Sequence, residues 1–344
     1  MAPLKLNIRS LIAVVIAFVG TIAIIILEPL SRDYSNYIDM FNAAANTSDV
    51  FTNLQTLELT FSVLAFVTQN FMVTVFIMSV IGLSVKMIFF CRYTEVAVIA
   101  VLYYFARFFL VQDVTQIRIA FAIAMLLLAF NYLLNKRFIV GFLFLFFAVI
   151  SHTSTIAYIP IIWLSATCNE PGGALKKIFR IMVIIVPILL LSAALIFEFI
   201  PLADIIAALP DARLGNYYNE IYDFEVPNLF TDVFFYLKLL ALLTLVFWRD
   251  NTRSADEHKL YLRFGIVFLF SLMFFVLFHQ LYAIATRLAD IAAPFECIIV
   301  ALFIVRLSKP NFSFFSPNTT IVLRVVLTLV IVVRLVVAQQ YLFS

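Results

Sequence analysis

Apolar runs of about the length that crosses a membrane recur from one end of this chain to the other. Hydrophobic residues make up 65% of the sequence and charged residues only 12%, far from the balance of a soluble domain. The runs are continuous stretches of Leu, Ile, Val and Phe, without the strict alternation of outer-membrane barrel strands. The sequence therefore predicts an all-α polytopic integral membrane protein with a single membrane domain over residues 1–344.

Basic residues predict the orientation of the helices, because loops rich in Lys and Arg stay in the cytoplasm. Lys5 and Arg9 precede the first apolar run, and no small-residue cleavage site follows it, so we expect an uncleaved first span. The pattern then predicts about eleven crossings, with short re-entrant or half-spanning pieces. Lys86 is assigned to the cytoplasmic side, residues 112–116 to an external turn, and residues 248–263 to a cytoplasmic loop.

Two further segments are predicted to lie outside the membrane on its external side. The first covers residues 29–57, where Asp33, Tyr37 and Phe41 are spaced as one face of a helix lying on the membrane surface. A break before a second long apolar helix is expected at Gln69–Asn70. The other external segment is a large loop over residues 200–229.

The apolar stretch 138–167 contains one polar break, Ser151-His152-Thr153-Ser154. Basic clusters flank this stretch on both sides, at 136–137 and at 176–180. If both clusters are cytoplasmic, the chain must go out and return within about 30 residues. The polar break is then the turn of a hairpin, and His152 lies near the external surface.

Ionisable residues inside apolar sequence are costly in hydrocarbon and mark functional positions. Arg118, His152, Arg287 and Asp290 have this property. The predicted topology brings them to the external half with Arg32, Asp33, Glu58, Arg107, Arg213, His279 and Glu296. Simpler roles exist for single members: span-end anchors for the arginines, a helix cap for His152, a helix N-terminal charge for Glu58, and pairing of Arg287 with Asp290.

A fixed anion beside a proton acceptor is the chemistry that these residue types suit. Arginine forks bind phosphate oxygens bidentately and stay charged. Histidine or a carboxylate takes a proton from a hydroxyl. The combination favours displacement of a lipid-linked phosphate by a sugar alcohol. The sequence has no P-loop, no HExxH zinc spacing and no GxSxG nucleophile elbow.

Several short motifs resemble the EpsG family of Wzy-like polymerases of bacterial exopolysaccharide and O antigen. They are D-x3-Y-x3-F at Asp33, Tyr37 and Phe41, Glu58-x2-Phe61, Arg118-Ile119-Ala120, Ser151-His152-x-Ser154 with Tyr158-Ile159-Pro160, and Arg287-Leu288-Ala289. The motifs follow the family order over most of residues 30–300.

The resemblance implies a metal-independent inverting glycosyltransferase of GT-C-like fold, without a cofactor, in the bacterial inner membrane. It would transfer a growing glycan from undecaprenyl diphosphate to the next undecaprenyl-diphosphate-linked unit on the periplasmic face. Arg118 and Arg287 would then bind diphosphate, and His152, Glu58 or Asp33 would be the base. Substrate contacts are expected from Tyr37, Arg213, His279 and Asp290. Expected partners are the lipid-linked oligosaccharide, membrane lipids and a chain-length regulator, and not nucleic acid.

Alternative functions use the same residues differently. An O-antigen ligase-type or other polyprenyl-linked sugar transferase would keep the arginines and change the acceptor. A transporter of lipid-linked oligosaccharide would have charges at the bilayer midplane and repeated halves. The clustering of charges toward one face disfavours the transporter, and a non-enzymatic scaffold gives no reason to bury so many ionisable groups.

Overall fold

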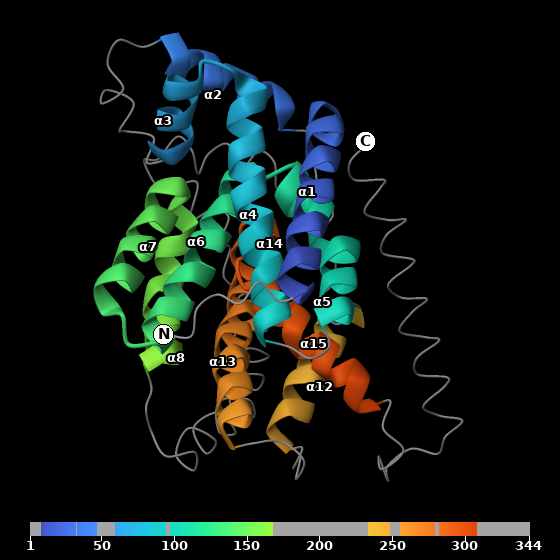
Figure 1. Ribbon diagram of the computed structural model, residues 1–344. Helices are drawn as coiled ribbons and strands as arrows, with labels where there is room; N and C mark the ends of the chain where they lie inside the picture. The colour runs from blue at the N-terminus through green and yellow to red at the C-terminus, as the bar shows by residue number, and fades with distance from the viewer. Residues whose placement is uncertain are drawn as a thin grey trace, which may run out of the picture. The chain divides into compact units, whose positions relative to one another are not determined.

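The computed structural model describes residues 8–31, 33–46, 59–93, 97–167, 233–247, 255–278 and 282–307, and the elements in these ranges are all helices (Figure 1). Contacts between residues divide the chain into two compact units, residues 1–167 with 304–344 and residues 168–303. Among the described residues, five helices are long and apolar enough to cross a membrane, or six when one bent pair counts as one span. These helices indicate a multi-pass membrane protein, whereas the predicted number of crossings is not confirmed.

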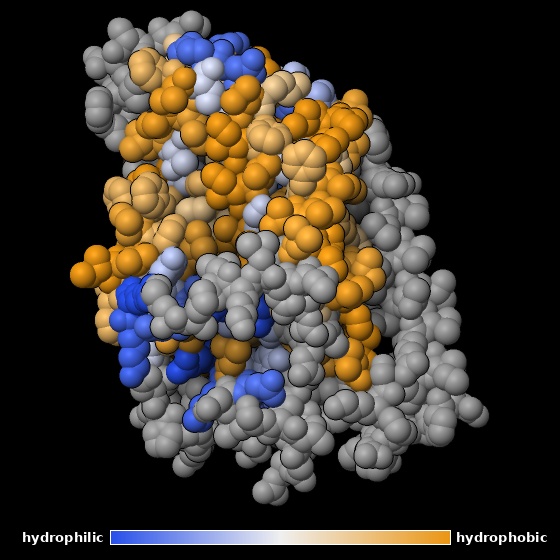
Figure 2. Space-filling model, viewed as in Figure 1, coloured by the Kyte–Doolittle hydropathy of each residue, from blue (hydrophilic) through white to orange (hydrophobic). Residues whose placement is uncertain are grey.

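The first unit is built around a long central helix whose residues are mostly buried. This helix, α6 (Ile117–Leu134), contacts α4 (Phe71–Tyr93), α7 (Phe138–Ser151) and α8 (Ile159–Thr167). The remaining elements are α1 (Ile8–Leu27), η1 (Glu28–Leu30), α2 (Tyr34–Asn46), α3 (Leu59–Thr68), α5 (Ala97–Tyr104), η3 (Phe105–Val114) and η4 (Thr153–Tyr158). Figure 2 shows hydrophobic side chains over most of the visible face, with hydrophilic residues gathered near α2 at one end and near the opposite end.

A helix is present in the predicted segment: α2 lies across the end of the unit where α1 ends and α4 begins (Figure 1). Asp33 precedes the helix, and its carbonyl oxygen accepts a 3.0 Å hydrogen bond from the Tyr37 backbone N–H. Tyr37 and Phe41 are buried. The Phe41 ring packs edge-on against Phe71 at 5.7 Å, so apolar contacts fix α2 to the start of α4.

The predicted break at Gln69–Asn70 is also present. Gln69 has φ of 50°, the left-handed conformation that ends a helix, and α3 stops one residue earlier. Asn70 is the N-cap of α4, because its Oδ1 accepts a hydrogen bond of 3.2 Å from the Val73 backbone N–H.

The predicted hairpin at the polar break is confirmed. Helix α7 ends at Ser151, and His152 is extended, with φ of −160° and ψ of 121°. The Trp163 ring of α8 stacks on Phe142 at 4.9 Å and lies 5.6 Å from Phe138, at the beginning of α7. The chain therefore reverses at His152 and runs back along the helix from which it came.

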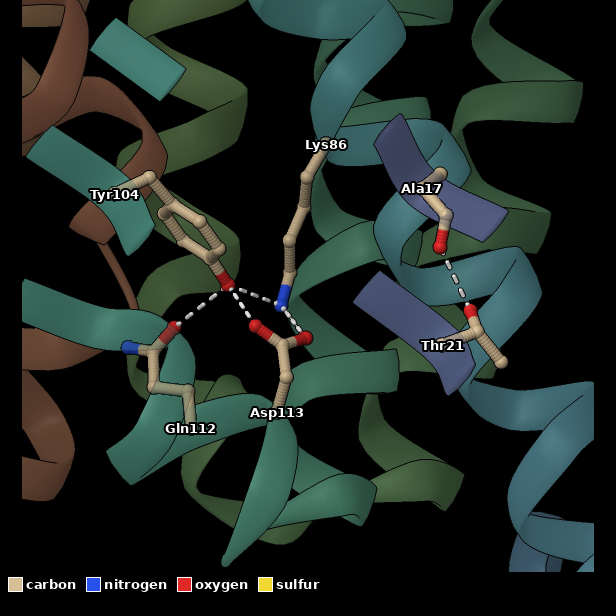
Figure 3. Close-up of polar contacts among 6 residues, drawn as sticks. All are labelled: Ala17, Thr21, Lys86, Tyr104, Gln112 and Asp113. Atoms are coloured by element: carbon tan, nitrogen blue, oxygen red, sulfur yellow. Dashed lines mark hydrogen bonds and ion pairs between the residues drawn. The ribbon is translucent and has the colours of Figure 1, made fainter. Parts of the chain in front are cut away.

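A buried ion pair joins Lys86 to Asp113 in the first unit. Lys86 Nζ lies 2.7 Å from Asp113 Oδ1, and both side chains are buried (Figure 3). The Tyr104 hydroxyl accepts a 2.7 Å hydrogen bond from Lys86 Nζ, donates to Asp113 Oδ2 and lies 3.5 Å from Gln112 Oε1. Residues 112–114 thus end the π-helix η3 inside the unit, and the prediction of a turn beginning at Gln112 was wrong.

The second unit, among the described residues, consists of α12 (Val233–Phe247), α13 (Ala255–Leu277), α14 (Tyr282–Asp290) and α15 (Ala293–Leu307). Helices α14 and α15 are bent by 67° at their junction. Lys238 of α12 forms a buried ion pair with Glu296 of α15 at 2.8 Å. Helix α13 begins at Ala255, inside the predicted cytoplasmic loop, because the charged residues there continue into the apolar run without a helix breaker.

Candidate functional site

The predicted site residues divide into those that the structure describes and those outside it. Arg32, Glu58, Arg213 and His279 lie outside the described residues. Asp33, Tyr37, Arg118 and His152 belong to the first unit. Arg287 and Asp290 belong to the second.

Arg118 and Tyr37 come together although they are far apart in the sequence. The guanidinium carbon of Arg118 lies 5.0 Å from the centre of the Tyr37 ring, close enough for a cation–π interaction. Arg118 is the second residue of α6. Gln116 precedes the helix, and its side chain does not cap the helix with a hydrogen bond. A fixed cation beside the open N–H groups of a helix N-terminus forms a strong anion-binding position.

The Tyr37 hydroxyl stays protonated in these surroundings. Burial raises the pKa of Tyr37 above its ordinary value of 10.0, and the charge of Asp33 adds to this effect. The charge and hydrogen bonding of Arg118 act in the opposite direction but do not reverse it. Tyr37 is therefore a neutral hydrogen-bond donor at physiological pH and not a base.

Helix α3 connects Tyr37 to the His152 hairpin. The Phe61 ring lies 5.8 Å from the Tyr37 ring. The neighbouring residue, Thr60, shares a hydrogen bond of 2.8 Å with the hydroxyl of Ser151. Motif residues from four separate segments of the sequence are thus linked by contacts in one part of the first unit.

The register between α6 and α7 gives the distance between Arg118 and the hairpin. Tyr132 stacks on Phe144 at 5.4 Å, and a Cβ on Gly141 would approach Leu133 to 2.6 Å, so the two helices are closely packed and antiparallel. Counting back along α6 at 1.5 Å per residue, Ser151 lies roughly 8–10 Å from Arg118 along the helix axis. A diphosphate with one attached sugar spans such a distance.

The ring of His152 is held by its own turn. Nδ1 accepts a hydrogen bond from the Ser154 backbone N–H and lies 2.7 Å from the Ser154 hydroxyl oxygen. The Thr155 hydroxyl donates to the His152 carbonyl oxygen at 2.8 Å. A neutral ring with Nδ1 as the acceptor carries its proton on Nε2, from which it can donate a hydrogen bond.

Arg287 and Asp290 lie one turn apart on α14, near its end. The Ser271 hydroxyl of α13 donates to the Ala289 carbonyl oxygen at 2.8 Å and so fixes this end of the helix. Helix α13 ends at Leu277 and α14 begins at Tyr282, and His279 lies outside the described residues. In the described part of the chain, no three His, Cys, Asp or Glu side chains gather as metal ligands would.

Sequence reasoning missed several polar residues of the first unit. Thr60 carried no motif signal, and the pairing of Lys86 with Asp113 depends on the tertiary fold. Glu28 is fully buried and directly follows the first apolar run. A lone carboxylate directly after such a run was the signal that could have identified it.

Comparison with known proteins places the chain in one family. No curated protein and no solved structure matches the sequence. The model of the EpsG family matches residues 11–343, nearly the whole chain. The chain is therefore a member of the EpsG family.

Proposed function

We propose that this protein polymerises lipid-linked oligosaccharide repeat units. Membership in the EpsG family indicates a glycosyltransferase-like function of the polysaccharide polymerase type. In the proposed reaction, a growing glycan moves from undecaprenyl diphosphate onto the next undecaprenyl-diphosphate-linked unit. We assign the reaction to the periplasmic face of the bacterial inner membrane and the protein to a GT-C-like fold.

The contact between Arg118 and Tyr37 at the start of α6 carries this proposal. The guanidinium and the helix N-terminus together offer two kinds of donor to a phosphate group. The Tyr37 hydroxyl adds a neutral donor on the same side. Binding of this type suits a diphosphate that must be held while negative charge develops on it.

The proposed chemistry is a single displacement at the anomeric carbon of the donor glycan. The acceptor hydroxyl oxygen forms the new bond to that carbon, and the bond from the carbon to the diphosphate oxygen breaks. Arg118, with Arg287 as the second proposed ligand, stabilises the departing diphosphate. Direct displacement inverts the configuration of the carbon, and the arginines take the part that a metal ion has in other transferases.

The proton of the acceptor hydroxyl is assigned to a carboxylate. His152 was an equal candidate for the base, but its Nδ1 accepts a hydrogen bond from Ser154. We therefore propose that His152 donates from Nε2 to a phosphate or sugar oxygen. Glu58 or Asp33 is left to take the proton.

The test compares arginine variants for the length of the glycan that they make. Arg118→Ala and Arg287→Ala should reach normal protein levels and yield only single-repeat product. Arg137→Ala, which removes an exposed arginine at the α6–α7 turn, is the matched control and should give full-length chains. Normal chain length in both site variants would contradict the catalytic assignment, and loss of transfer to a terminal acceptor instead of loss of chain growth would favour a ligase.

A further inference from the structure

Glu28 differs in its hydrogen bonding from Asp113, the other buried carboxylate in the described part of the first unit. Its side chain is fully buried, and neither of its carboxylate oxygens has a hydrogen-bond partner among the residues that the structure describes. Asp113, also buried in this unit, is bonded to both Lys86 and Tyr104. An uncompensated carboxyl in apolar surroundings costs stability, so its presence points to a ligand that supplies the missing hydrogen bonds.

Ser31 has the same property and lies in the same turn. Its hydroxyl oxygen is buried and, within the described part of the chain, has no partner. The Ser31 backbone N–H donates to the Glu28 carbonyl oxygen at 2.8 Å and closes the 3₁₀ turn η1. Residues three apart in a 3₁₀ turn lie on the same side of it, so both side chains belong to one side of this turn, although they do not bond to each other.

This turn leads directly into the helix that carries Tyr37. The Tyr34 backbone N–H donates to the Ser31 carbonyl oxygen at 3.2 Å, and η1 contacts α2. Helix α2 begins three residues after Ser31, and Tyr37 lies in its first turn. Because the Tyr37 ring contacts Arg118, the turn is joined through α2 to the proposed diphosphate site.

We propose that Glu28 and Ser31 form a hydrogen-bonding subsite for the hydroxyl groups of a sugar in the lipid-linked substrate. The two oxygens of a carboxylate accept hydrogen bonds from neighbouring hydroxyls of one sugar ring, and a serine hydroxyl both donates and accepts. Carboxylates lack the positive charge that a phosphate needs, so the subsite selects the glycan and not the diphosphate. This inference rests on the proposed function, because it assigns the sugar part of that substrate.

The test measures binding of two probes to the purified full chain in detergent: undecaprenyl diphosphate alone and the same lipid carrying its oligosaccharide repeat unit. Glu28→Met should weaken binding of the sugar-bearing lipid about 10-fold or more and leave binding of the bare lipid unchanged. Its thermal unfolding midpoint should equal or exceed that of the wild type, because an unpartnered polar group has been removed. Arg118→Ala should weaken binding of both probes.

Thr21→Val is the matched control, because Thr21 is also fully buried in the first span and its hydroxyl donates to the Ala17 carbonyl oxygen at 2.9 Å (Figure 3). It should leave binding of both probes unchanged. Unaltered binding of the sugar-bearing lipid by Glu28→Met would overturn the subsite, as would a lowered unfolding midpoint, which would reveal a structural partner. If the wild type binds neither probe, the proposed function fails and the subsite with it. If the wild type binds both probes and Arg118→Ala weakens their binding, but Glu28→Met binds both as the wild type does, the subsite fails and the proposed function stands.

Discussion

Breaking the buried ion pair between Lys86 and Asp113 should destabilise the first unit, whereas replacing both residues should not. The side chains are 0% and 2% exposed, and their charged atoms lie 2.7 Å apart. Removing one partner of such a pair leaves a buried charge uncompensated, at a cost of about 3–5 kcal/mol. Tyr104 still offers a hydrogen bond to the residue that remains, so we expect Lys86→Met and Asp113→Leu each to cost about 3 kcal/mol, the lower end of this range.

The double variant tests the reasoning more sharply than either single change. With both charges gone, no ion is left to desolvate, and the Tyr104 hydroxyl retains Gln112 Oε1 within 3.5 Å. We therefore expect the double variant to unfold within about 1 kcal/mol of the wild type. Independent effects would instead add to about 6 kcal/mol.

Trp163 provides the signal for this measurement, because it stacks on Phe142 in the first unit. The chain has 2 tryptophans, and Trp248→Phe leaves Trp163 as the single reporter. Unfolding would be followed by fluorescence in mixed micelles titrated with sodium dodecyl sulfate. Single variants as stable as the wild type would refute the view that each charge offsets the cost of burying the other. A double variant whose free energy of unfolding falls by the sum of the two single effects would refute it as well.

Three further predictions concern the first unit. Burial raises the pKa of Tyr37, so the folded state retains the proton to higher pH than the unfolded state, and stability should fall as pH rises above about 10. Tyr37→Phe should reduce this loss of stability in unfolding experiments from about pH 8 to about pH 11. An equal loss in the variant would contradict the effect of burial. The hydrogen bond between Thr60 and Ser151 should give a coupling of about 1 kcal/mol in a cycle of Thr60→Val and Ser151→Ala, and additive effects would count against it. In a cysteine-free background, Ser154→Cys should react with an impermeant maleimide from outside the cell, and exclusive labelling from the cytoplasm would invert the proposed orientation.

Local sequence patterns were sufficient to predict the elements that carry the site. The spacing of Tyr37 and Phe41 predicted α2, because a helix with an apolar face needs no information beyond its own residues. The polar run at Ser151 predicted the hairpin, because a long apolar stretch between two basic clusters must reverse somewhere. These predictions depended on spacing within a single segment.

Pairings between distant segments could not be predicted in this way. Asp113 resembled a residue of a polar external turn, and its burial depends on contacts with Tyr104 and with Lys86, which lies 27 positions earlier. The contact of Arg118 with Tyr37 likewise depends on the packing of α2 across the bundle end. In each case, a side chain from another helix decides whether a polar residue lies inside or outside.

The shortness of α7 has a consequence for the surrounding lipid. The helix has 14 residues, about 21 Å at 1.5 Å per residue, against a hydrocarbon thickness of about 30 Å. Its outer face is apolar and exposed, with Ile139 86% and Phe146 58% accessible. A bilayer that meets this face experiences hydrophobic mismatch and thins locally, at a cost of fractions of a kcal/mol per Å. Thinning would draw lipid headgroups toward His152, so that the protein adapts the membrane to the depth of its site.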